Sequence, residues 1–195
     1  MADPRVVGAM RAVPRENFLA DPYRRDAYQD RPLPIGHGQT ISAPHMVAIM
    51  SDALRLEPGL NVLEVGTGSG YHAAVTARLI RPGGRLTSIE YVPQLAAVAR
   101  ENLRRSGESS VEVVAADGSR GWPAGAPYDR IYLTCTAMRF PPPLVDELAP
   151  DGLILGPIGG EPARLTRAHR AGETWIEEDL GACAFVPLRG QYGLG

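Results

Sequence analysis

A strand, a glycine-rich turn and a helix follow one another between residues 61 and 80, and this unit constrains the fold most strongly. The segment Asn61–Val65, which runs into Gly66, predicts a strand, and the apolar face of Tyr71–Ile80 predicts a helix that ends before Pro82. The turn between them contains Gly66, Gly68 and Gly70. Glycine lets the backbone bend sharply and lets a ligand approach it closely. The segment therefore predicts an α/β unit with a ligand-binding turn.

Strand and helix patterns continue to alternate after this unit. The expected strands are Arg85–Ile89, Val111–Ala115, Asp129–Thr134 and Leu153–Ile158, and the expected helices are Val92–Arg105 and Pro142–Leu148. Two successive strands, Ala163–Arg170 and Thr174–Leu188, follow as a C-terminal antiparallel hairpin. The alternation predicts an α/β fold whose mostly parallel sheet has helices on both faces. With 195 residues, the chain fits one domain, with an α/β core at 47–160 and C-terminal strands at 161–195.

Residues 1–46 precede this core as a head segment. Asp3–Val13 predicts a short helix that Pro4 can open at its first turn, and a second helical pattern begins at His45. Between them, Tyr23–Pro44 is rich in proline and glycine, so we expect an ordered loop without regular helices or strands. A loop of this length is uncommon in a compact domain unless it binds something.

Composition excludes several classes of protein. A net charge of -2 with 22% charged residues fits neither a disordered chain nor a strongly basic nucleic-acid binder. No apolar run approaches the roughly 20 residues that cross a bilayer, and the N-terminus does not resemble a signal peptide, so we expect a cytoplasmic protein without membrane association. Cys135 and Cys183 are too few for a disulfide framework, and the histidines and cysteines lack zinc-site spacing, so we expect no metal.

The spacing of the glycine turn selects among nucleotide-type ligands. A dinucleotide-binding fingerprint requires a glycine where Tyr71 stands, and a phosphate-binding P-loop requires a lysine, which this chain lacks entirely. Glu90 ends the second strand at a distance that suits a ribose, and Asp117 with Gly118 follows the third strand. Glycine turn and carboxylates therefore indicate a nucleoside-type cofactor.

Three carboxylates would make such a pocket anionic. If Glu64, Glu90 and Asp117 all face the ligand, the pocket disfavours a pyrophosphate and favours a cationic ligand such as a sulfonium. S-adenosylmethionine fits these requirements.

Several longer motifs surround these residues. They are Val13-Pro14-Arg15-Glu16-Asn17-Phe18, Pro32-Leu33-Pro34-Ile35-Gly36, Gly38-Gln39-Thr40-Ile41-Ser42, Asp117-Gly118 with Gly121-Trp122, Ala126-Pro127-Tyr128-Asp129 and Phe185-Val186-Pro187-Leu188. With these motifs the chain resembles the protein-L-isoaspartate (D-aspartate) O-methyltransferase family over nearly its whole length. The resemblance implies a Rossmann-like class I S-adenosylmethionine-dependent methyltransferase fold with a seven-stranded sheet.

The resemblance also implies roles for individual residues. Ser42 matches the active-site serine of the family. The expected cofactor-binding residues are Gln39, Thr40, Ile41, Glu64, Gly66, Thr67, Gly68, Gly70, Tyr71, Glu90, Asp117 and Gly118. The expected peptide-binding residues are Ala43, Pro44, His45, Val186, Pro187 and Leu188.

The implied reaction is repair: methyl transfer from S-adenosylmethionine to the α-carboxylate of L-isoaspartyl residues in damaged proteins and peptides. That carboxylate is ionised at neutral pH and needs no general base, so Ser42 is interpreted as an orienting hydrogen-bonding residue and not as a nucleophile. Two alternatives remain: methylation of a normal aspartate in one dedicated peptide, and cofactor binding without catalysis. We expect a monomer whose partners are isoaspartyl peptides.

Overall fold

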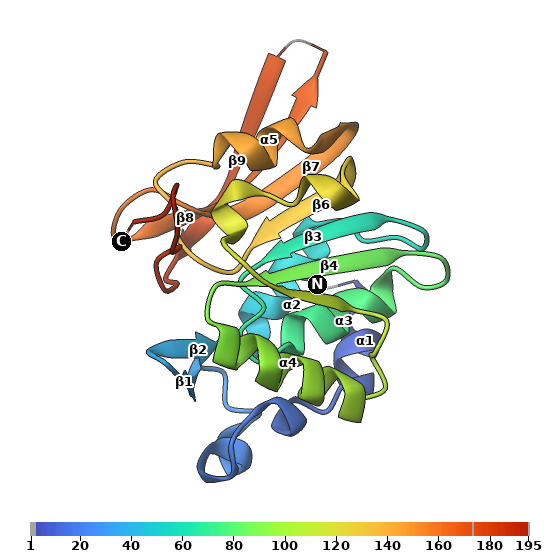
Figure 1. The fold of residues 1–195 in the computed structure, drawn as a ribbon, viewed down its shortest axis with the longest axis vertical. Coiled ribbons are helices and arrows are strands. Elements are labelled where there is room, and N and C mark those ends of the chain that lie inside the picture. Colours follow the sequence, from blue (N-terminus) through green and yellow to red (C-terminus); the bar gives the residue numbers. More distant parts are fainter. Residues whose placement is uncertain (1–2, 173, 195) are drawn as a thin grey trace.

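The computed structural model describes residues 3–172 and 174–194. A seven-stranded sheet runs through the molecule in the order β5-β4-β3-β6-β7-β8-β9 (Figure 1). Its strands are β3 (Asn61–Val65), β4 (Arg85–Glu90), β5 (Glu112–Ala115), β6 (Tyr128–Leu133), β7 (Leu148–Ile158), β8 (Ala163–Ala171) and β9 (Thr174–Cys183). Neighbouring strands from β5 to β7 are parallel, and β8 and β9 are antiparallel. The α/β prediction with a C-terminal antiparallel hairpin is confirmed.

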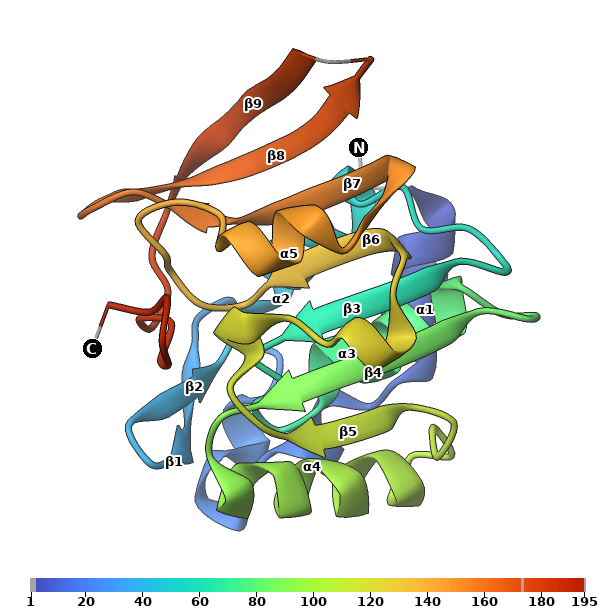
Figure 2. The ribbon, with the colours of Figure 1, turned by 45° about the horizontal axis from the view of Figure 1, so that its top comes forward.

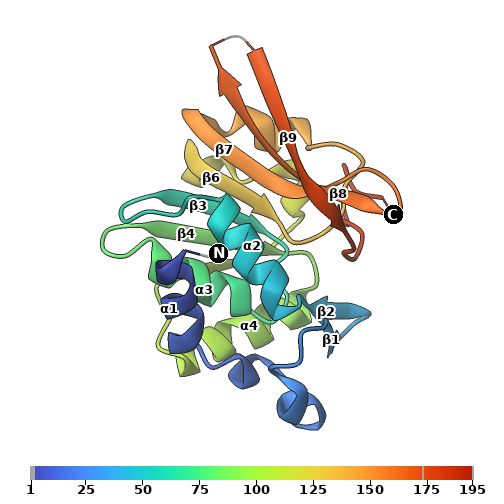
Figure 3. The same ribbon diagram turned by 180° about the vertical axis from the view of Figure 1, so that it is seen from behind.

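Helices cover both faces of this sheet. The helices are α1 (Pro4–Ala12), α2 (Pro44–Ala53), α3 (Tyr71–Leu79), α4 (Pro93–Arg105) and α5 (Pro142–Asp146). Figure 3 shows α1, α2 and α3 together on one face, while α5 lies on the opposite face in Figure 1. A sheet covered on both faces needs strands without polar alternation. In β3, Val62, Leu63, Glu64 and Val65 are accordingly all buried, and a separate apolar cluster packs on each face.

The prediction of a loop without regular structure at Tyr23–Pro44 is wrong. The segment contains part of a 3₁₀ helix (Asp21–Asp26) and an antiparallel hairpin of β1 (Leu33–Gly36) and β2 (Gln39–Ile41). The strands tolerate Pro34 because they form a separate two-stranded sheet with free edges. Leu33 and Ile41 pair across the hairpin and are both buried, so apolar contact with the core offsets the unfavourable composition.

The C-terminal strand ends earlier than expected. β9 stops at Cys183, whereas the sequence pattern extends the strand to Leu188. The chain then leaves the sheet edge, and Pro187 forms an isolated parallel bridge with Thr136. The bonds of Thr136 N–H to Val186 O and of Leu188 N–H to Thr136 O, each 2.8 Å, bring this segment to the ends of the central strands.

Within the described ranges, no helix combines the length and the apolar character needed to span a membrane.

Candidate active site

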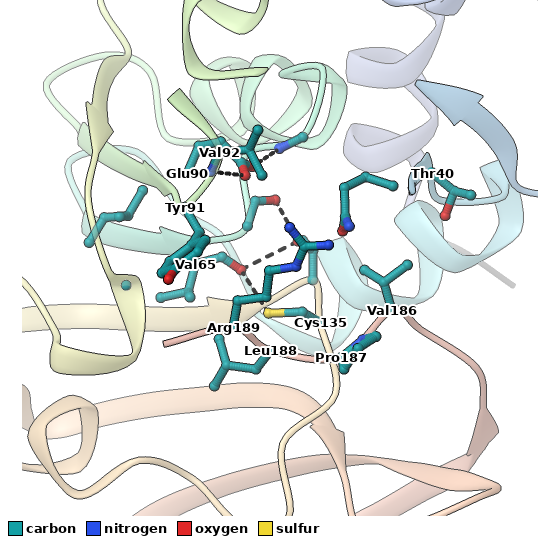
Figure 4. Close-up of a pocket in the computed structure, with 16 residues that line it drawn as sticks. Thr40, Val65, Glu90, Tyr91, Val92, Cys135, Val186, Pro187, Leu188 and Arg189 are labelled. Carbon is teal, nitrogen blue, oxygen red and sulfur yellow. Dashed lines mark hydrogen bonds between the residues drawn. The ribbon is translucent and has the colours of Figure 1, made fainter. Parts of the chain in front are cut away.

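A pocket opens at the carboxyl ends of β3, β4 and β6 (Figure 4). Parallel α/β sheets bind ligands at this edge because the strand ends and the turns that follow them converge there. The lining residues come from the β1–β2 hairpin, the glycine turn, the end of β4 and the C-terminal segment. They are Gln39, Thr40, Val65, Gly66, Gly68, Ile89, Glu90, Tyr91, Val92, Gly118, Thr134, Cys135, Val186, Pro187, Leu188 and Arg189.

The three glycines of the turn have different structural roles. Gly66 has a φ of 102°, and a Cβ there would lie 2.3 Å from Thr134 Oγ1, so no side chain fits without displacing Thr134. Gly68 has a φ of 55°, and a Cβ there would lie 3.2 Å from Ile35 Cδ1, so the turn packs closely against the β1–β2 hairpin. Gly70 lies outside the pocket, where its missing side chain lets Leu103 of α4 pack against the start of α3.

Glu90 is fixed at the mouth of the pocket by backbone donors. The N–H of Gly68 donates to Oε2 at 2.8 Å, and the N–H of Val92 donates to Oε1 at 2.9 Å. Burial raises the pKa of Glu90, and these two hydrogen bonds together with the charge of Arg189 oppose the rise. The glycine turn and the end of β4 thereby form one rigid unit that presents a carboxylate to the pocket.

Glu64 lies beneath the turn in a second hollow. This hollow shares Thr40, Gly66, Gly68 and Thr134 with the pocket and is also lined by Ile41, Ser42, Val47, Glu64, Thr67, Ser69, Tyr71 and His72. Glu64 is fully buried, accepts a hydrogen bond from Ser88 Oγ, and has no partner for Oε1. Burial raises the pKa of Glu64 to about 8.

Asp117 does not line the pocket. Its Oδ1 accepts hydrogen bonds from the N–H and the Oγ of Ser119, at 3.0 and 2.6 Å, and its Oδ2 accepts one from the N–H of Gln191 at 2.9 Å. The structure therefore does not bring Glu64, Glu90 and Asp117 to one anionic surface. The pocket holds the single carboxylate of Glu90 together with the guanidinium of Arg189.

Arg189 is the main site residue that the sequence analysis missed. It follows directly after Val186-Pro187-Leu188, and Figure 4 shows its side chain extending among the residues that line the pocket. Only its position next to Val186-Pro187-Leu188, which the sequence analysis assigned to the site, could have indicated that Arg189 lies there. A lone arginine in a chain with 20 arginines and no lysine gives no stronger one.

Ser42 is half-buried in the second hollow and is positioned through its backbone. Arg15 Nη1 donates to Ser42 O at 2.6 Å, and Arg15 Nε donates to Ala27 O at 2.6 Å. The guanidinium also stacks on the ring of Tyr71, 5.3 Å from its centroid. Arg15 is fully buried, and burial lowers its pKa. This arginine joins the head, the segment before α2 and the start of α3.

The expected peptide-binding residues divide into two groups. Val186, Pro187 and Leu188 line the pocket. Ala43, Pro44 and His45 line neither hollow. The His45 side chain is about half exposed, and its Nδ1 lies 2.8 Å from Asp30 Oδ1, while Pro44 begins α2.

The sequence and the fold were compared with known proteins. Residues 1–193 match the family described as protein-L-isoaspartate (D-aspartate) O-methyltransferase. A protein-L-isoaspartate O-methyltransferase of Archaeoglobus fulgidus is 48% identical over 190 residues, which cover 97% of this chain and 87% of that protein. One from Hyperthermus butylicus is 50% identical over 195 residues, which cover 95% of this chain and 81% of that protein.

Solved structures agree with these sequence matches. A Plasmodium falciparum protein described as a protein-L-isoaspartate O-methyltransferase, in complex with S-adenosyl-L-homocysteine, superposes with a TM-score of 0.86 at 26% identity and covers 97% of this chain and 92% of its own. The family match over residues 1–193, relatives near 50% identity and the same fold lead to one conclusion. The chain belongs to the protein-L-isoaspartate (D-aspartate) O-methyltransferase family.

Proposed function

We propose that this enzyme transfers a methyl group from S-adenosylmethionine to the α-carboxylate of L-isoaspartyl residues in damaged proteins and peptides. The match to the family over residues 1–193 and the activity named for its relatives support this reaction. One observation carries the assignment to this site: Glu90 and Ser42 lie in two hollows that share the glycine turn. Cofactor and acceptor groups can therefore meet across that turn.

The pocket suits S-adenosylmethionine. Glu90, held by Gly68 and Val92, offers carboxylate oxygens to the hydroxyls of a ribose, and Val65, Ile89 and Leu188 offer apolar surface to a base. When bound, the cofactor supplies a sulfonium methyl group that is already activated for displacement. A side chain at Gly68 would press on the hairpin, since its Cβ would lie 3.2 Å from Ile35 Cδ1. The cofactor assignments of Gln39, Thr40, Gly66 and Gly118 are supported by their place in this lining, whereas Gly70 and Asp117 do not line it.

The acceptor needs orientation more than activation. An isoaspartyl α-carboxylate has a pKa of about 3.5, as a chain terminus has, so it is ionised at neutral pH without a general base. We assign Ser42 Oγ the role of a hydrogen-bond donor that holds this carboxylate in line, and Arg15 the role of holding Ser42 through its carbonyl. Alignment and exclusion of water then account for catalysis.

A repair enzyme must accept damage in many sequence contexts. Binding an extended peptide through its backbone, beside Val186-Pro187-Leu188, would allow this breadth. The test is methylation of a set of isoaspartyl peptides whose flanking residues are shuffled, with the Ser42→Ala variant as the background control. We expect base-labile methyl esters on most of the set. Methylation of one flanking sequence alone would contradict a general repair function.

We further propose that the enzyme acts as a cytoplasmic monomer that does not bind nucleic acid. Cys135 and Cys183 are both free and buried, which suits a reducing compartment, and the net charge of -2 disfavours binding to phosphates. Sedimentation equilibrium at micromolar concentration tests the monomer, and a dimer mass there would contradict it.

A further inference from the structure

The chain after β9 closes one side of the pocket. We define the strap as residues 186–194, of which Val186, Pro187, Leu188 and Arg189 line the pocket. Figure 2 shows this dark-red segment beyond the arrowheads of β3 and β6, next to the β1–β2 hairpin. The strap is therefore a wall of the pocket made from chain that belongs to no strand of the sheet.

The first half of the strap is fixed to the segment that follows β6 and to the core. Thr136 exchanges two backbone hydrogen bonds with it, to Val186 O and from the N–H of Leu188, each 2.8 Å. The Leu188 side chain is buried in the apolar cluster on the α5 face of the sheet. We therefore expect the first half of the strap to stay in place when the cofactor binds or dissociates.

Outside the strap itself, the second half is held by the side chains of Asp117 and Ser119, which we call the latch; within the strap, the N–H of Leu194 donates to Leu188 O at 2.8 Å. The N–H of Gln191 donates to Asp117 Oδ2 at 2.9 Å, and the N–H of Tyr192 donates to Ser119 Oγ at 3.1 Å. Ser119 is fully buried and donates from Oγ to Asp117 Oδ1 at 2.6 Å, which fixes both groups of the latch.

The latch fits the strap closely. A Cβ on Gly190 would lie 1.9 Å from Asp117 Oδ1, so the strap reaches the carboxylate only because residue 190 has no side chain. Gly118, between the two latch residues, lines the pocket itself, and Arg189 lies between the two attachment points. The latch thus acts on the part of the strap that stands opposite Glu90.

We propose that Asp117 and Ser119 are positioning residues that hold the strap closed over the cofactor and so set the rate at which the cofactor dissociates. The proposal rests on the assignment of this pocket to S-adenosylmethionine. Opening the second half of the strap requires breaking the two N–H bonds to the latch, one of them to a carboxylate, and the bond of Leu194 N–H to Leu188 O, while the Thr136 contacts serve as the hinge.

Two variants loosen the latch without replacing a residue that lines the pocket. Ser119→Ala removes the acceptor for Tyr192 N–H and the donor to Asp117. Gly190→Ala places a methyl group where Asp117 Oδ1 now lies. Gly181→Ala is the matched control, because Gly181 has a φ of 119°, against 115° for Gly190, but its added methyl meets nothing within 4 Å. The control carries the same backbone strain without disturbing the strap.

The measurement is the dissociation rate of S-adenosyl-L-homocysteine by stopped flow, with hydrogen exchange at residues 190–194 as a local readout. In Ser119→Ala the hydrogen bonds of Ser119 Oγ are lost, so S-adenosyl-L-homocysteine should dissociate about tenfold faster. Gly190→Ala should release at least as fast, and Gly181→Ala should release at the wild-type rate. Faster exchange at 190–194 should accompany faster release.

Unchanged release in Ser119→Ala and Gly190→Ala, while Glu90→Ala weakens cofactor binding, would overturn the strap proposal alone. If Gly190→Ala fails to fold, the dissociation rate measured for Ser119→Ala decides whether the strap proposal stands. Unchanged affinity in Glu90→Ala would remove the pocket assignment and the strap proposal with it.

Discussion

Replacing Glu64 with glutamine should change how the stability of the fold depends on pH. Glu64 is fully buried beneath the glycine turn, and its pKa is raised from 4.5 to about 8 by burial. At neutral pH the folded protein therefore keeps a proton on Glu64 that the unfolded chain has lost. Where the folded state binds more protons than the unfolded state, stability falls as pH rises.

The expected size follows from this one proton. Between the unfolded pKa near 4.5 and the folded pKa of about 8, each pH unit costs about 1.4 kcal/mol of unfolding free energy. His72, whose pKa burial lowers from 6.5 to about 3, acts in the opposite direction below about pH 6.5. In the wild type the two effects largely cancel in acid and leave the Glu64 effect visible above about pH 6.5.

Comparison with Glu64→Gln removes the His72 contribution, because both proteins contain it. Urea unfolding between about pH 5.5 and about pH 7.5 should show the difference in stability, variant minus wild type, rising by roughly 3 kcal/mol. Glu101→Gln is the control: Glu101 is exposed, Arg104 lowers its pKa, and the difference should stay constant over this range. A constant difference for Glu64→Gln would show that Glu64 is ionised in the folded protein and would refute the reasoning.

Three further substitutions test the site. Ser42→Ala should lower turnover on an isoaspartyl peptide far more than it weakens cofactor binding, because Ser42 is assigned to the acceptor; equal losses in kinetics and in calorimetry would make it a cofactor ligand. Glu90→Ala should weaken cofactor binding about tenfold or more through loss of the ribose hydrogen bonds, as measured by calorimetry, and an unchanged affinity would remove this assignment. Gly66→Ala should cost more than about 1 kcal/mol in urea unfolding, since its Cβ would lie 2.3 Å from Thr134 Oγ1 at a positive φ, and a stability equal to the wild type would contradict the close approach.

Local patterns predicted the α/β core because each element of it carries a strong signal of its own. Asn61–Val65 carries Val62, Leu63 and Val65 between the breakers Gly59 and Gly66, and the α4 segment has a clear amphipathic period with Pro93 at its first turn. Such elements depend little on the rest of the chain. Their observed boundaries differ from the expected ones by a few residues, except in β7, which begins at Leu148 rather than Leu153.

The errors lie where distant contacts override local composition. The β1–β2 hairpin forms in a segment rich in proline and glycine because Leu33 and Ile41 reach the core. The strand expected to continue to Leu188 ends at Cys183, because Thr136 binds Val186 and Leu188 and draws the chain away from the sheet edge. Neither partner can be inferred from the neighbours of these residues in the sequence.

In the site, too, local patterns predicted some residues correctly, and distant contacts determined the position of others. Glu90 and the glycine turn could be placed together because both follow adjacent parallel strands. By that rule Asp117 should also face the pocket, but its carboxylate binds Ser119 and the backbone of Gln191, which arrives from the far end of the chain. Arg189 and Arg15 enter the site for similar reasons, since a single arginine carries no sign of where its guanidinium will lie.

The central claim is that this enzyme methylates the α-carboxylate of isoaspartyl residues. Its most direct test is methyl transfer from labelled S-adenosylmethionine to two peptides that are identical except that one contains L-isoaspartate and the other L-aspartate. We expect label on the isoaspartyl peptide alone, in an ester that mild base removes. Equal labelling of both peptides, or no labelling of either by protein that binds the cofactor, would contradict the claim.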